Sequence, residues 1–457
     1  MNKAKIFIFF CLCTTGLLSI SSAVQAQYLD SVRLSAPADV VHNTPLVLAK
    51  DNKLSFEFGK ERMVIPDGLQ PSMLTTKAGT IIVQSQNSKK PLPQQRIFYP
   101  YAMTTVISRD KGETWNEFSF PKGSNGVDIE GGAIQLRNGK ILAMETYVTP
   151  GKAADEGIGI MYTSTNDWRT LQGPVEIKFH IPDADFYSST DDGGRPHAAM
   201  RLHRRIIELP NGDLLTTIYG WQKGDNEPAG YIPTMKKTRV MLFRSKDKGM
   251  NWDYVSTVAA EKGIGTEGFG EPVINRVNKG THEGRLISLM RTGRELYKTI
   301  SDDNGKTWSK PEPIVFAERD VYATDQWKEM FKDTKRKGEL IVNNPNEIIG
   351  AVVDPDLLSL RSGILVAAFG VRIPARANWQ NPTHPWNGNY LAFSTDGGDT
   401  WGNILQLTSG IFTTHYMAIE ETNKDNNIFV AYDFGHWTNK TGRYTYGRRL
   451  AISIMKK

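Results

Sequence analysis

Residues 269–308 read FGEPVINRVNKGTHEGRLISLMRTGRELYKTISDDNGKTW. Two runs within this stretch, EPVINRV and RLISLMR, mix apolar with polar residues, and glycine, asparagine and charged residues separate and follow them. Short runs bounded by turn-forming residues are typical of antiparallel β-strands. The stretch closes on SDDNGKTW, a polar turn that ends at Trp308. This turn recurs along the chain, and its recurrence decides the fold.

The closing turn follows the pattern Ser-x-Asp-x-Gly-x-x-Trp. It occurs four times, as SRDKGETW (108–115), SKDKGMNW (245–252), SDDNGKTW (301–308) and STDGGDTW (394–401), and a degenerate copy, STNDW, ends at Trp168. We expect the aspartate to accept hydrogen bonds from the turn, the glycine to take a positive φ, and the tryptophan to pack onto the hairpin. Recurrence at intervals of roughly forty to fifty residues or more is typical of a propeller built from four-stranded blades.

Six stretches share a second pattern: an apolar strand, a turn with glycine or asparagine, and another apolar strand. They begin at Gln70, Glu130, His203, Glu271, Asp354 and His415. One blade for each opening predicts an all-β fold, a six-bladed β-propeller of four-stranded antiparallel blades. Residues 28–60 are expected to supply an outer strand that closes the ring against the last blade. No proline- or serine-rich linker interrupts residues 27–457, so we interpret them as one domain.

Residues 1–26, MNKAKIFIFFCLCTTGLLSISSAVQA, have the features of a secretory signal peptide. Lys3 and Lys5 precede a short apolar run, and small residues end at Ala26. We predict cleavage before Gln27 and a secreted or periplasmic location in a bacterium. A membrane anchor is the alternative, but polar residues interrupt the apolar run, so no membrane span is expected. Both cysteines lie in this segment, so the rest of the chain is predicted to lack disulfide bonds.

The charge and motif content narrow the range of partners. The formal net charge of +6 falls to +4 without the two lysines of the signal peptide. This charge is mild, and no basic run carries interleaved aromatic residues, so nucleic acid is not an expected partner. The histidines are scattered, and no glycine-rich phosphate loop follows a strand. Neither a metal nor another cofactor is therefore predicted.

The four polar turns resemble the Asp-boxes, or BNR repeats, of the sialidase (neuraminidase) superfamily. The resemblance covers nearly the whole chain after the signal peptide. It implies a six-bladed propeller and an exo-acting glycoside hydrolase that removes a terminal, acidic or decorated sugar from a glycan or polysaccharide. The turns are more specific for the fold than for the substrate. The expected partner is thus a carbohydrate, and the chain is expected to act as a monomer.

The six openings also predict where a site lies. The start of each innermost strand of a propeller is close to the central axis, so the first polar residues of the openings are expected to form a ring. Arg204 and Tyr416 follow His203 and His415 in this ring by one residue. Convergence of carboxylates, imidazoles and arginines is what a sugar-binding pocket needs. The alternative is that these residues face solvent at the mouth of a channel.

The resemblance implies roles for individual residues. Glu271 corresponds to the family's glutamate that polarises a nucleophilic tyrosine, and Tyr416 corresponds to that tyrosine. Arg291 and Arg372 resemble arginines that bind a substrate carboxylate. The alternatives are a structural ion pair between Glu271 and Arg291, an aromatic ring packed in the last blade, and a solvated loop arginine.

Two positions depart from the family pattern. The first blade opens with Gln70 in place of the family's arginine, and residues 81–107, where the family's acid/base aspartate belongs, contain no aspartate or glutamate. Because glycoside hydrolysis usually needs two carboxyl groups, we predict that Glu271 works with Glu130 or Asp354. Such a pair resembles that of the arabinan-cleaving propeller hydrolases. A sialidase proper is the alternative.

The remaining residues of the ring permit other chemistries. His203 and Arg204, with Gln70 and His415, predict a binding ring for an acidic sugar, and the alternative is a solvated strand face. A polysaccharide lyase is a second hypothesis, in which Arg204 neutralises a uronate carboxylate while a histidine or Tyr416 moves the α-proton. A third hypothesis is a propeller that binds glycans without catalysis.

Overall fold

The structure is a computed structural model, and it describes residues 27–33, 43–91, 101–120, 126–186, 188–189, 197–230, 235–314, 351–372, 387–411, 413–435 and 442–455. Within these residues the fold is all-β, and the single helical element is the short 3-10 turn η1 (Ile129–Gly131). Nothing helical in this part of the chain has the length and apolar character needed to cross a membrane. The predicted signal peptide, residues 1–26, lies outside the described residues.

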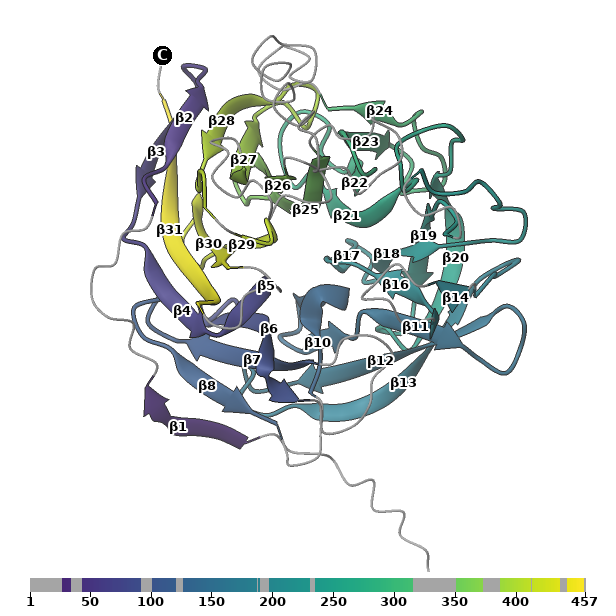
Figure 1. Cartoon of the computed structure of the whole chain (residues 1–457), viewed down its shortest axis with the longest axis horizontal. Helices are drawn as coiled ribbons and strands as arrows, with labels where there is room; N and C mark the ends of the chain where they lie inside the picture. The colour runs from purple at the N-terminus through teal and green to yellow at the C-terminus, as the bar shows by residue number, and fades with distance from the viewer. Residues whose placement is uncertain are drawn as a thin grey trace, which may run out of the picture.

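The strands form antiparallel sheets arranged in a ring around a central axis, the arrangement of a β-propeller (Figure 1). The first sheet runs in the order β1 (Gln27–Arg33), β8 (Asn116–Ser119), β7 (Tyr101–Ser108), β6 (Ile81–Pro91) and β5 (Gly68–Thr75). The next is a ten-stranded sheet of β11 (Tyr147–Pro150), β16 (Met200–Leu202), β18 (Leu214–Gly220), β19 (Arg239–Ser245), β20 (Asn251–Ala259), β13 (Gln172–His180), β12 (Glu156–Ser164), β10 (Ile141–Met144) and β9 (Ala133–Gln135), with β17 (Ile207–Glu208) paired to β18.

Three further sheets continue the ring. One contains β21 (Gly270–Arg276), β22 (Leu286–Arg291), β23 (Leu296–Ser301) and β24 (Glu312–Pro313). Another contains β25 (Ala351–Ser359), β26 (Leu365–Arg372), β27 (Gly388–Ser394), β28 (Gly402–Gln406) and β2 (Leu46–Ala49). The last contains β29 (Met417–Glu421), β30 (Asn427–Phe434), β31 (Tyr444–Ile454), β3 (Leu54–Phe58) and β4 (Arg62–Pro66). A small pair, β14 (Ser188–Ser189) and β15 (His197–Ala198), lies apart from them.

The N-terminal strands close the ring. β3 pairs with the C-terminal strand β31, from Leu54 opposite Ile454 to Phe58 opposite Leu450. This is the closing strand predicted from residues 28–60. The structure adds a feature that the sequence did not indicate, because β1 and β2 extend the edges of two other sheets.

The ten-stranded sheet differs from the separate four-stranded blades that the sequence predicts. It joins the strands of the second and third openings, because the nine-residue strands β13 and β20 pair in parallel. Phe179 stacks on Trp252 across this seam, with ring centroids 5.8 Å apart and an interplanar angle of 10°. Aromatic packing therefore holds two outer edges close enough to share hydrogen bonds.

The Asp-boxes fold as predicted. In the first copy Ser108 Oγ donates to Asp110 Oδ1 at 2.8 Å, and Gly112 has a φ of +87°. The same serine–aspartate bond recurs in the other three copies. Trp115 is buried and packs edge-to-face on Phe429 of the last sheet. Burial of one such ring contributes about 4–6 kcal/mol before its entropy cost, so the motif staples a hairpin and also seals a seam between sheets.

The apolar core lies between successive sheets. One cluster joins Val366 and Phe393 of the β25–β28 sheet to Val430, Tyr446 and Leu450 of the last sheet. Because both faces of each sheet are covered by its neighbours, the apolar side chains of the strands are used in these seams. The axis is left to the polar residues at which the innermost strands begin.

Candidate functional site

Each of the innermost strands β5, β21 and β25 starts with a bulge that carries a polar residue. The pairing with the next strand is irregular at this point in all three. Gln70, Glu271 and Asp354 occupy the bulges with φ values of 55°, 42° and 49°, and a proline follows each of them. Such a conformation costs a non-glycine residue about 1–2 kcal/mol and persists only where surrounding contacts hold it. The bulges re-aim these side chains relative to the pleat of their strands.

The same conformation marks two other openings, at Arg204 (φ 47°) and His415 (φ 69°). Glu130 lies instead in the 3-10 turn η1, where Asp128 caps its backbone N–H at 3.1 Å. The structure therefore shifts the predicted register of the third opening by one residue, from His203 to Arg204. The signal for a bulge, an acidic or amide residue before proline at the start of a strand, is present in the sequence at three of these positions.

Glu271, Arg291 and Tyr416 meet at the axis. Tyr416 Oη donates a hydrogen bond to Glu271 Oε1, and Arg291 Nη1 donates to the same oxygen at 2.6 Å. The other carboxylate oxygen, Oε2, accepts from the backbone N–H of Asp354 at 3.0 Å. Glu271 and Tyr416 are both buried, with 8% of each residue exposed. The structure thus brings together three residues that the sequence analysis selected from three different parts of the chain.

The charges around this group shift the pKa values of Glu271 and Tyr416 in opposite directions. Burial favours the protonated form of Glu271, but the positive charge of Arg291 and the hydrogen bond from Tyr416 outweigh it and lower the pKa of Glu271 to about 2. Burial and the negative charge of Glu271 raise the pKa of Tyr416 well above 10. Glu271 is therefore a fixed carboxylate, and Tyr416 is a neutral hydrogen-bond donor to it.

Arg372 lies against the other side of Tyr416. Its guanidinium carbon is 5.4 Å from the centroid of the tyrosine ring, and it donates to the carbonyl oxygen of Thr414 at 2.7 and 3.2 Å. Among the described residues no carboxylate forms an ion pair with Arg372, whereas Arg291 also pairs with Glu267 at 2.9 Å. Burial and the nearby charge of Arg291 lower the pKa of Arg372, because both disfavour its cation.

Asp354 is held in a buried ion pair. Arg204 Nη2 donates to its two oxygens at 2.7 and 2.8 Å, and the backbone N–H of Met417 donates to Oδ2 at 2.8 Å. Asp354 is 0% exposed and Arg204 5% exposed. Both residues are thus buried in an internal ion pair, which contradicts a solvated strand face at Arg204 and favours a structural role over direct contact with a substrate.

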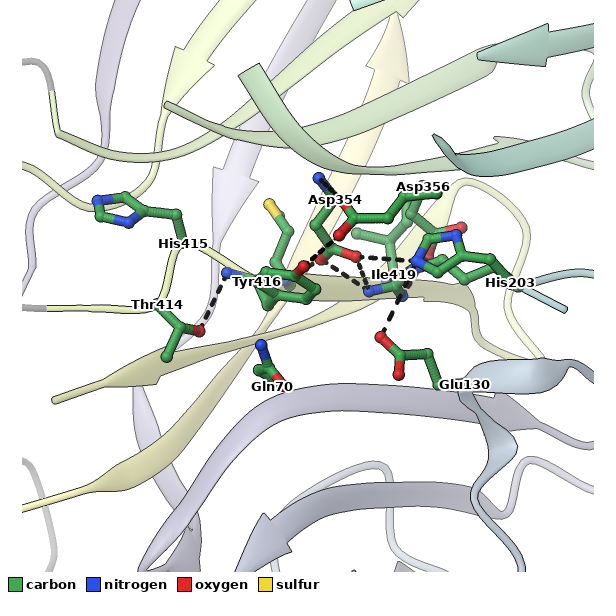
Figure 2. Close-up of polar contacts among 12 residues, drawn as sticks. Gln70, Glu130, His203, Asp354, Asp356, Thr414, His415, Tyr416 and Ile419 are labelled. Atoms are coloured by element: carbon green, nitrogen blue, oxygen red, sulfur yellow. Dashed lines mark hydrogen bonds and ion pairs between the residues drawn. The ribbon is translucent and has the colours of Figure 1, made fainter. Parts of the chain in front are cut away.

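His203 and Glu130 form the opposite side of the cluster (Figure 2). His203 Nδ1 lies 3.2 Å from the carbonyl oxygen of Pro272, which can only accept, so Nδ1 carries a proton. His203 Nε2 lies 3.3 Å from Asp354 Oδ1 and 3.9 Å from Glu130 Oε1. Burial, reinforced by the negative charge of Asp128, raises the pKa of Glu130 to about 7. Glu130 is therefore a carboxyl group that exchanges its proton near neutral pH.

Two predicted binding residues take other positions. Figure 2 shows His415 directed away from the cluster, and this residue is 1% exposed, so Tyr416 is the one that enters the hub. Gln70 accepts a hydrogen bond from Gln86 Nε2 at 2.8 Å, and its backbone N–H donates to Asp433 Oδ2 at 2.8 Å. Asp433 also accepts from the hydroxyl groups of Thr413 and Thr414, so one buried carboxylate ties two blade openings together.

Glu267 supports the site, and its role was not predicted from the sequence. Glu267 binds Arg291 from the loop before β21, four residues ahead of Glu271. Asp356 and Glu420 bind Arg205 from β25 and β29, two residues after Asp354 and four residues after Tyr416. Their spacing along strands that start at the hub was the available signal, because residues two apart lie on the same face of a strand.

Glu130, His203 and Asp354 also place one potential metal ligand each within 4.8 Å of one another. Arg204 already neutralises both oxygens of Asp354, and His203 Nε2 lies in ion-pair distance of the same carboxylate. The arrangement fits a shared proton better than a divalent cation, so we do not assign a metal to it.

Comparison with known proteins supports the repeat architecture. The BNR repeat-like domain family matches residues 147–424, well over half of the chain. The chain belongs to this family. The match confirms the resemblance to the sialidase-like superfamily that the Asp-box turns indicate. No curated protein matches the sequence.

Solved structures share the fold of this BNR-repeat chain at low sequence identity. They include a protein of unknown function from Dyadobacter fermentans, with 18% identity, 90% of this chain and 98% of that chain covered, and a TM-score of 0.54. An α-L-arabinanase of Penicillium chrysogenum complexed with arabinobiose has 13% identity, coverages of 91% and 98%, and a TM-score of 0.50. A GH93 α-L-arabinofuranosidase of Fusarium graminearum with arabinobiose has 12% identity, coverages of 89% and 96%, and a TM-score of 0.52. The TM-scores and coverages show a common fold, and at these identities they show the fold alone.

Proposed function

We propose that this protein is an exo-acting glycoside hydrolase in which Glu130 and Glu271 form the catalytic pair. The observation that carries the proposal is the separation of their pKa values within one hub, about 7 for Glu130 and about 2 for Glu271. Two carboxyl groups whose surroundings push their pKa values apart are typical of the acid and the ionised partner of a glycosidase. The arabinanase and arabinofuranosidase with the same fold bind arabinobiose, which supports a carbohydrate substrate.

The roles follow from protonation. Glu130, which is protonated below about pH 7, donates its proton to the glycosidic oxygen as the bond to the anomeric carbon breaks. Glu271, which stays ionised, stabilises or captures the positive charge that develops at that carbon. Arg291 and Tyr416 hold Glu271 in place and keep it charged. Water then adds its oxygen to the anomeric carbon and gives a proton back to Glu130, which restores the starting state of the enzyme.

Tyr416 as the nucleophile is the second candidate, because its hydroxyl group already donates to Glu271. Transfer of that proton to Glu271 is strongly unfavourable, because the pKa of Glu271 is about 2 whereas burial and the negative charge of Glu271 raise the pKa of Tyr416 well above 10. This cost favours Tyr416 as the group that orients Glu271.

The substrate is proposed to be a terminal acidic or decorated sugar. Arg372 supports this choice, because it is the hub arginine that no carboxylate pairs with among the described residues. Arg204 does not serve a uronate in the same way, since it is 5% exposed, its Nη2 donates to both oxygens of Asp354, and its Nη1 lies 3.4 Å from Asp356 Oδ2. The lyase hypothesis, which needs Arg204 for that purpose, is therefore not favoured.

We further infer six blades for residues 27–457, since the ten-stranded sheet contains two of the six predicted openings, at Glu130 and His203. The protein is proposed to be a single-domain monomer. The signal-peptide features of residues 1–26 support export to the periplasm or the exterior.

The test compares Glu130→Gln and Glu271→Gln on a panel of aryl glycosides that includes α-L-arabinofuranosides, uronides and sialosides. Glu271→Gln is expected to lower kcat/KM by about 10³-fold on every substrate that turns over. Glu130→Gln is expected to impair poor leaving groups and to spare 2,4-dinitrophenyl glycosides, which need no acid. Glu420→Gln, a buried carboxyl group that pairs with Arg205, serves as the matched control.

Each outcome decides between hypotheses. Unchanged turnover in Glu271→Gln would remove the catalytic assignment. Glycan binding without turnover by the unaltered protein would favour the non-catalytic alternative. A product that absorbs at roughly 230–235 nm would indicate a lyase, because proton abstraction followed by elimination leaves a conjugated double bond.

A further inference from the structure

A cavity of about 280 Å³ lies at the seam between the first and last sheets. It is lined by the first Asp-box turn, by β31 and by residues near the start of β4. Ser108, where this Asp-box starts, pairs with Ile81, which pairs with Thr75 at the end of β5 opposite to Gln70. The cavity therefore lies toward the other face of the ring from the hub, roughly 17 Å or more away along the innermost strand.

Phe429 lies beneath the cavity and is only 2% exposed, because two glycines pack directly against its ring. A Cβ on Gly112 would lie 2.6 Å from this ring, and a Cβ on Gly447 would lie 2.5 Å from it. Trp115 packs against Phe429 from the core side with ring centroids 5.5 Å apart. The two glycines thus let backbone from two sheets pack closely onto one fixed aromatic ring.

The walls of the cavity are cationic. Five basic side chains line it, those of Lys60, Arg62, Lys111, Arg448 and Arg449. One carboxylate, Glu113, also lines the cavity. Arg448 also pairs with Glu61 at 3.5 Å. Even without Lys60, the four other basic side chains carry four positive charges. Glu61 and Glu113 carry two negative charges, so a net charge of +2 remains around the cavity.

Glu113 orients two of these cations but accepts a hydrogen bond from only one nitrogen of each. Its two oxygens accept one hydrogen bond each, from Arg62 Nη2 at 2.5 Å and from Arg449 Nη2 at 2.6 Å. Among the described residues neither guanidinium donates to a second acceptor. Each guanidinium has five N–H donors, so most of them remain available at the wall of the cavity.

We propose that this cavity is a second carbohydrate-binding site, which takes a carboxylate- or sulfate-bearing sugar residue of an anionic polysaccharide. Arginine guanidinium groups bind carboxylate and sulfate oxygens through pairs of N–H donors. The volume is just below the roughly 300–1,000 Å³ of drug-sized ligand sites, which matches one charged sugar residue. The inference rests on the proposed function only in the choice of carbohydrate as the ligand.

The surplus charge is local, and this favours a sugar over nucleic acid. Residues 27–457 carry a formal charge of only +4, which gives little of the long-range attraction that nucleic-acid binding needs. A site that holds a polysaccharide away from the hub would keep the enzyme on its polymer while successive chain ends reach Glu271. Lys111 comes from the first sheet and Arg449 from the last, so a bound anion would also bridge the closure of the ring.

The test measures binding of two anionic tetrasaccharides, an oligogalacturonate and a sulfated glycosaminoglycan fragment, by calorimetry at constant ionic strength. A neutral tetrasaccharide is the ligand control. Lys111→Glu is expected to weaken anionic binding at least ten-fold. Lys248→Glu is the matched protein control, because Lys248 occupies the same turn position of the second Asp-box with a φ of 62°, against 67° at Lys111, and does not line the cavity.

Hydrolysis of small aryl glycosides by Lys111→Glu is expected to equal that of the unaltered protein, which would separate this site from the hub. Unchanged oligosaccharide binding in Lys111→Glu would overturn the inference. So would equal binding of the neutral tetrasaccharide, equal loss in Lys248→Glu, or equally tight binding of a DNA oligonucleotide of the same charge. Because the readout is binding, failure of the proposed hydrolase activity would leave this result unaffected.

Discussion

Tyr416 Oη donates a hydrogen bond to Glu271 Oε1 at the axis of the ring, although 145 positions separate the two residues in the chain. Arg291 donates to the same oxygen from the strand beside Glu271. One carboxylate thus accepts from two sheets at once. A negative charge held in this way is positioned before any substrate arrives, which is what stabilisation of a developing positive charge needs.

Replacement of Tyr416 by phenylalanine should show which role this hydroxyl group has. Loss of the donor removes a contact that favours ionised Glu271, so the pKa of Glu271 should rise from about 2. The acid limb of kcat/KM should then move to higher pH, with a fall in kcat of about 10–10²-fold. A loss of more than about 10⁴-fold would instead identify Tyr416 as the nucleophile. Tyr432→Phe, which removes a buried hydroxyl bonded to Glu61, is the control.

Glu130 should set the alkaline limb of activity. Its pKa of about 7 means that the proton donor is lost as the pH rises through neutrality, so kcat/KM should fall above about pH 7. Glu130→Gln, assayed on activated substrates, should lack this limb. A limb that persists unchanged in Glu130→Gln would assign it to another group.

The free energy of unfolding should also depend on pH through the protonation of Glu130. The folded-state pKa of Glu130 lies above its ordinary value of 4.5, so folding favours the protonated form. The stability that this provides is complete below about pH 4.5 and is lost as the pH rises through about 7. The shift corresponds to about 3 kcal/mol, and Glu130→Gln should flatten this part of the pH profile of the unfolding free energy.

Asp433 should act as a positioning residue. It is 0% exposed and accepts hydrogen bonds from Gln70 N–H, from Thr414 N–H and from two threonine hydroxyls, in the turn that precedes Tyr416. Asp433→Asn places an N–H₂ group against these donors and should lower kcat by about 10–10²-fold through displacement of Tyr416. A merely structural role would lower the melting temperature and leave kcat and the pH profile unchanged. Glu420→Gln is again the matched control.

Arg372 should discriminate between substrate classes. Its partly buried cation lies against Tyr416 and donates to a carbonyl oxygen, so an anionic substrate group would supply the counter-charge. Arg372→Gln should raise KM at least ten-fold for acidic glycosides and change it little for neutral ones. Equal effects on both classes would remove the acidic sugar from the proposal.

The Asp-boxes should contribute to stability alone. Asp247 accepts from the backbone N–H groups of Met250 and Asn251 at 3.1 and 2.9 Å, and from Ser245 Oγ at 2.8 Å. Asp247→Ala leaves these donors to solvent and should lower the unfolding free energy by about 1–3 kcal/mol. The kcat/KM values should not change, because the turn lies at the rim of the ring. A change in kcat/KM at full occupancy of the folded state would contradict this separation.

The parts of the fold that the sequence predicted correctly are those built from local contacts. Each of these bonds in the third Asp-box joins residues two to four positions apart, so the seven residues from Ser301 to Thr307 contain the whole set. Glu271 and Arg291 lie on neighbouring strands of one sheet, β21 and β22, and their pairing was within reach for the same reason. The parallel pairing of β13 with β20 could not be predicted from the sequence, because contact between two outer edges depends on how neighbouring sheets pack.

By itself, the sequence determined the ring of antiparallel sheets and the polar character of its hub, because turn chemistry and strand alternation are encoded over a few residues. Only the tertiary structure decided which side chain of each opening faces the axis. A one-residue change at a bulge reverses the face of a strand, and on that basis Tyr416 enters the hub while His415 points away. The tertiary structure also decided that Arg204 forms an ion pair with Asp354, 150 residues later in the chain, and that the pKa of Glu130 rises to about 7. Burial and charge set both outcomes, and both arise only when distant strands share one axis.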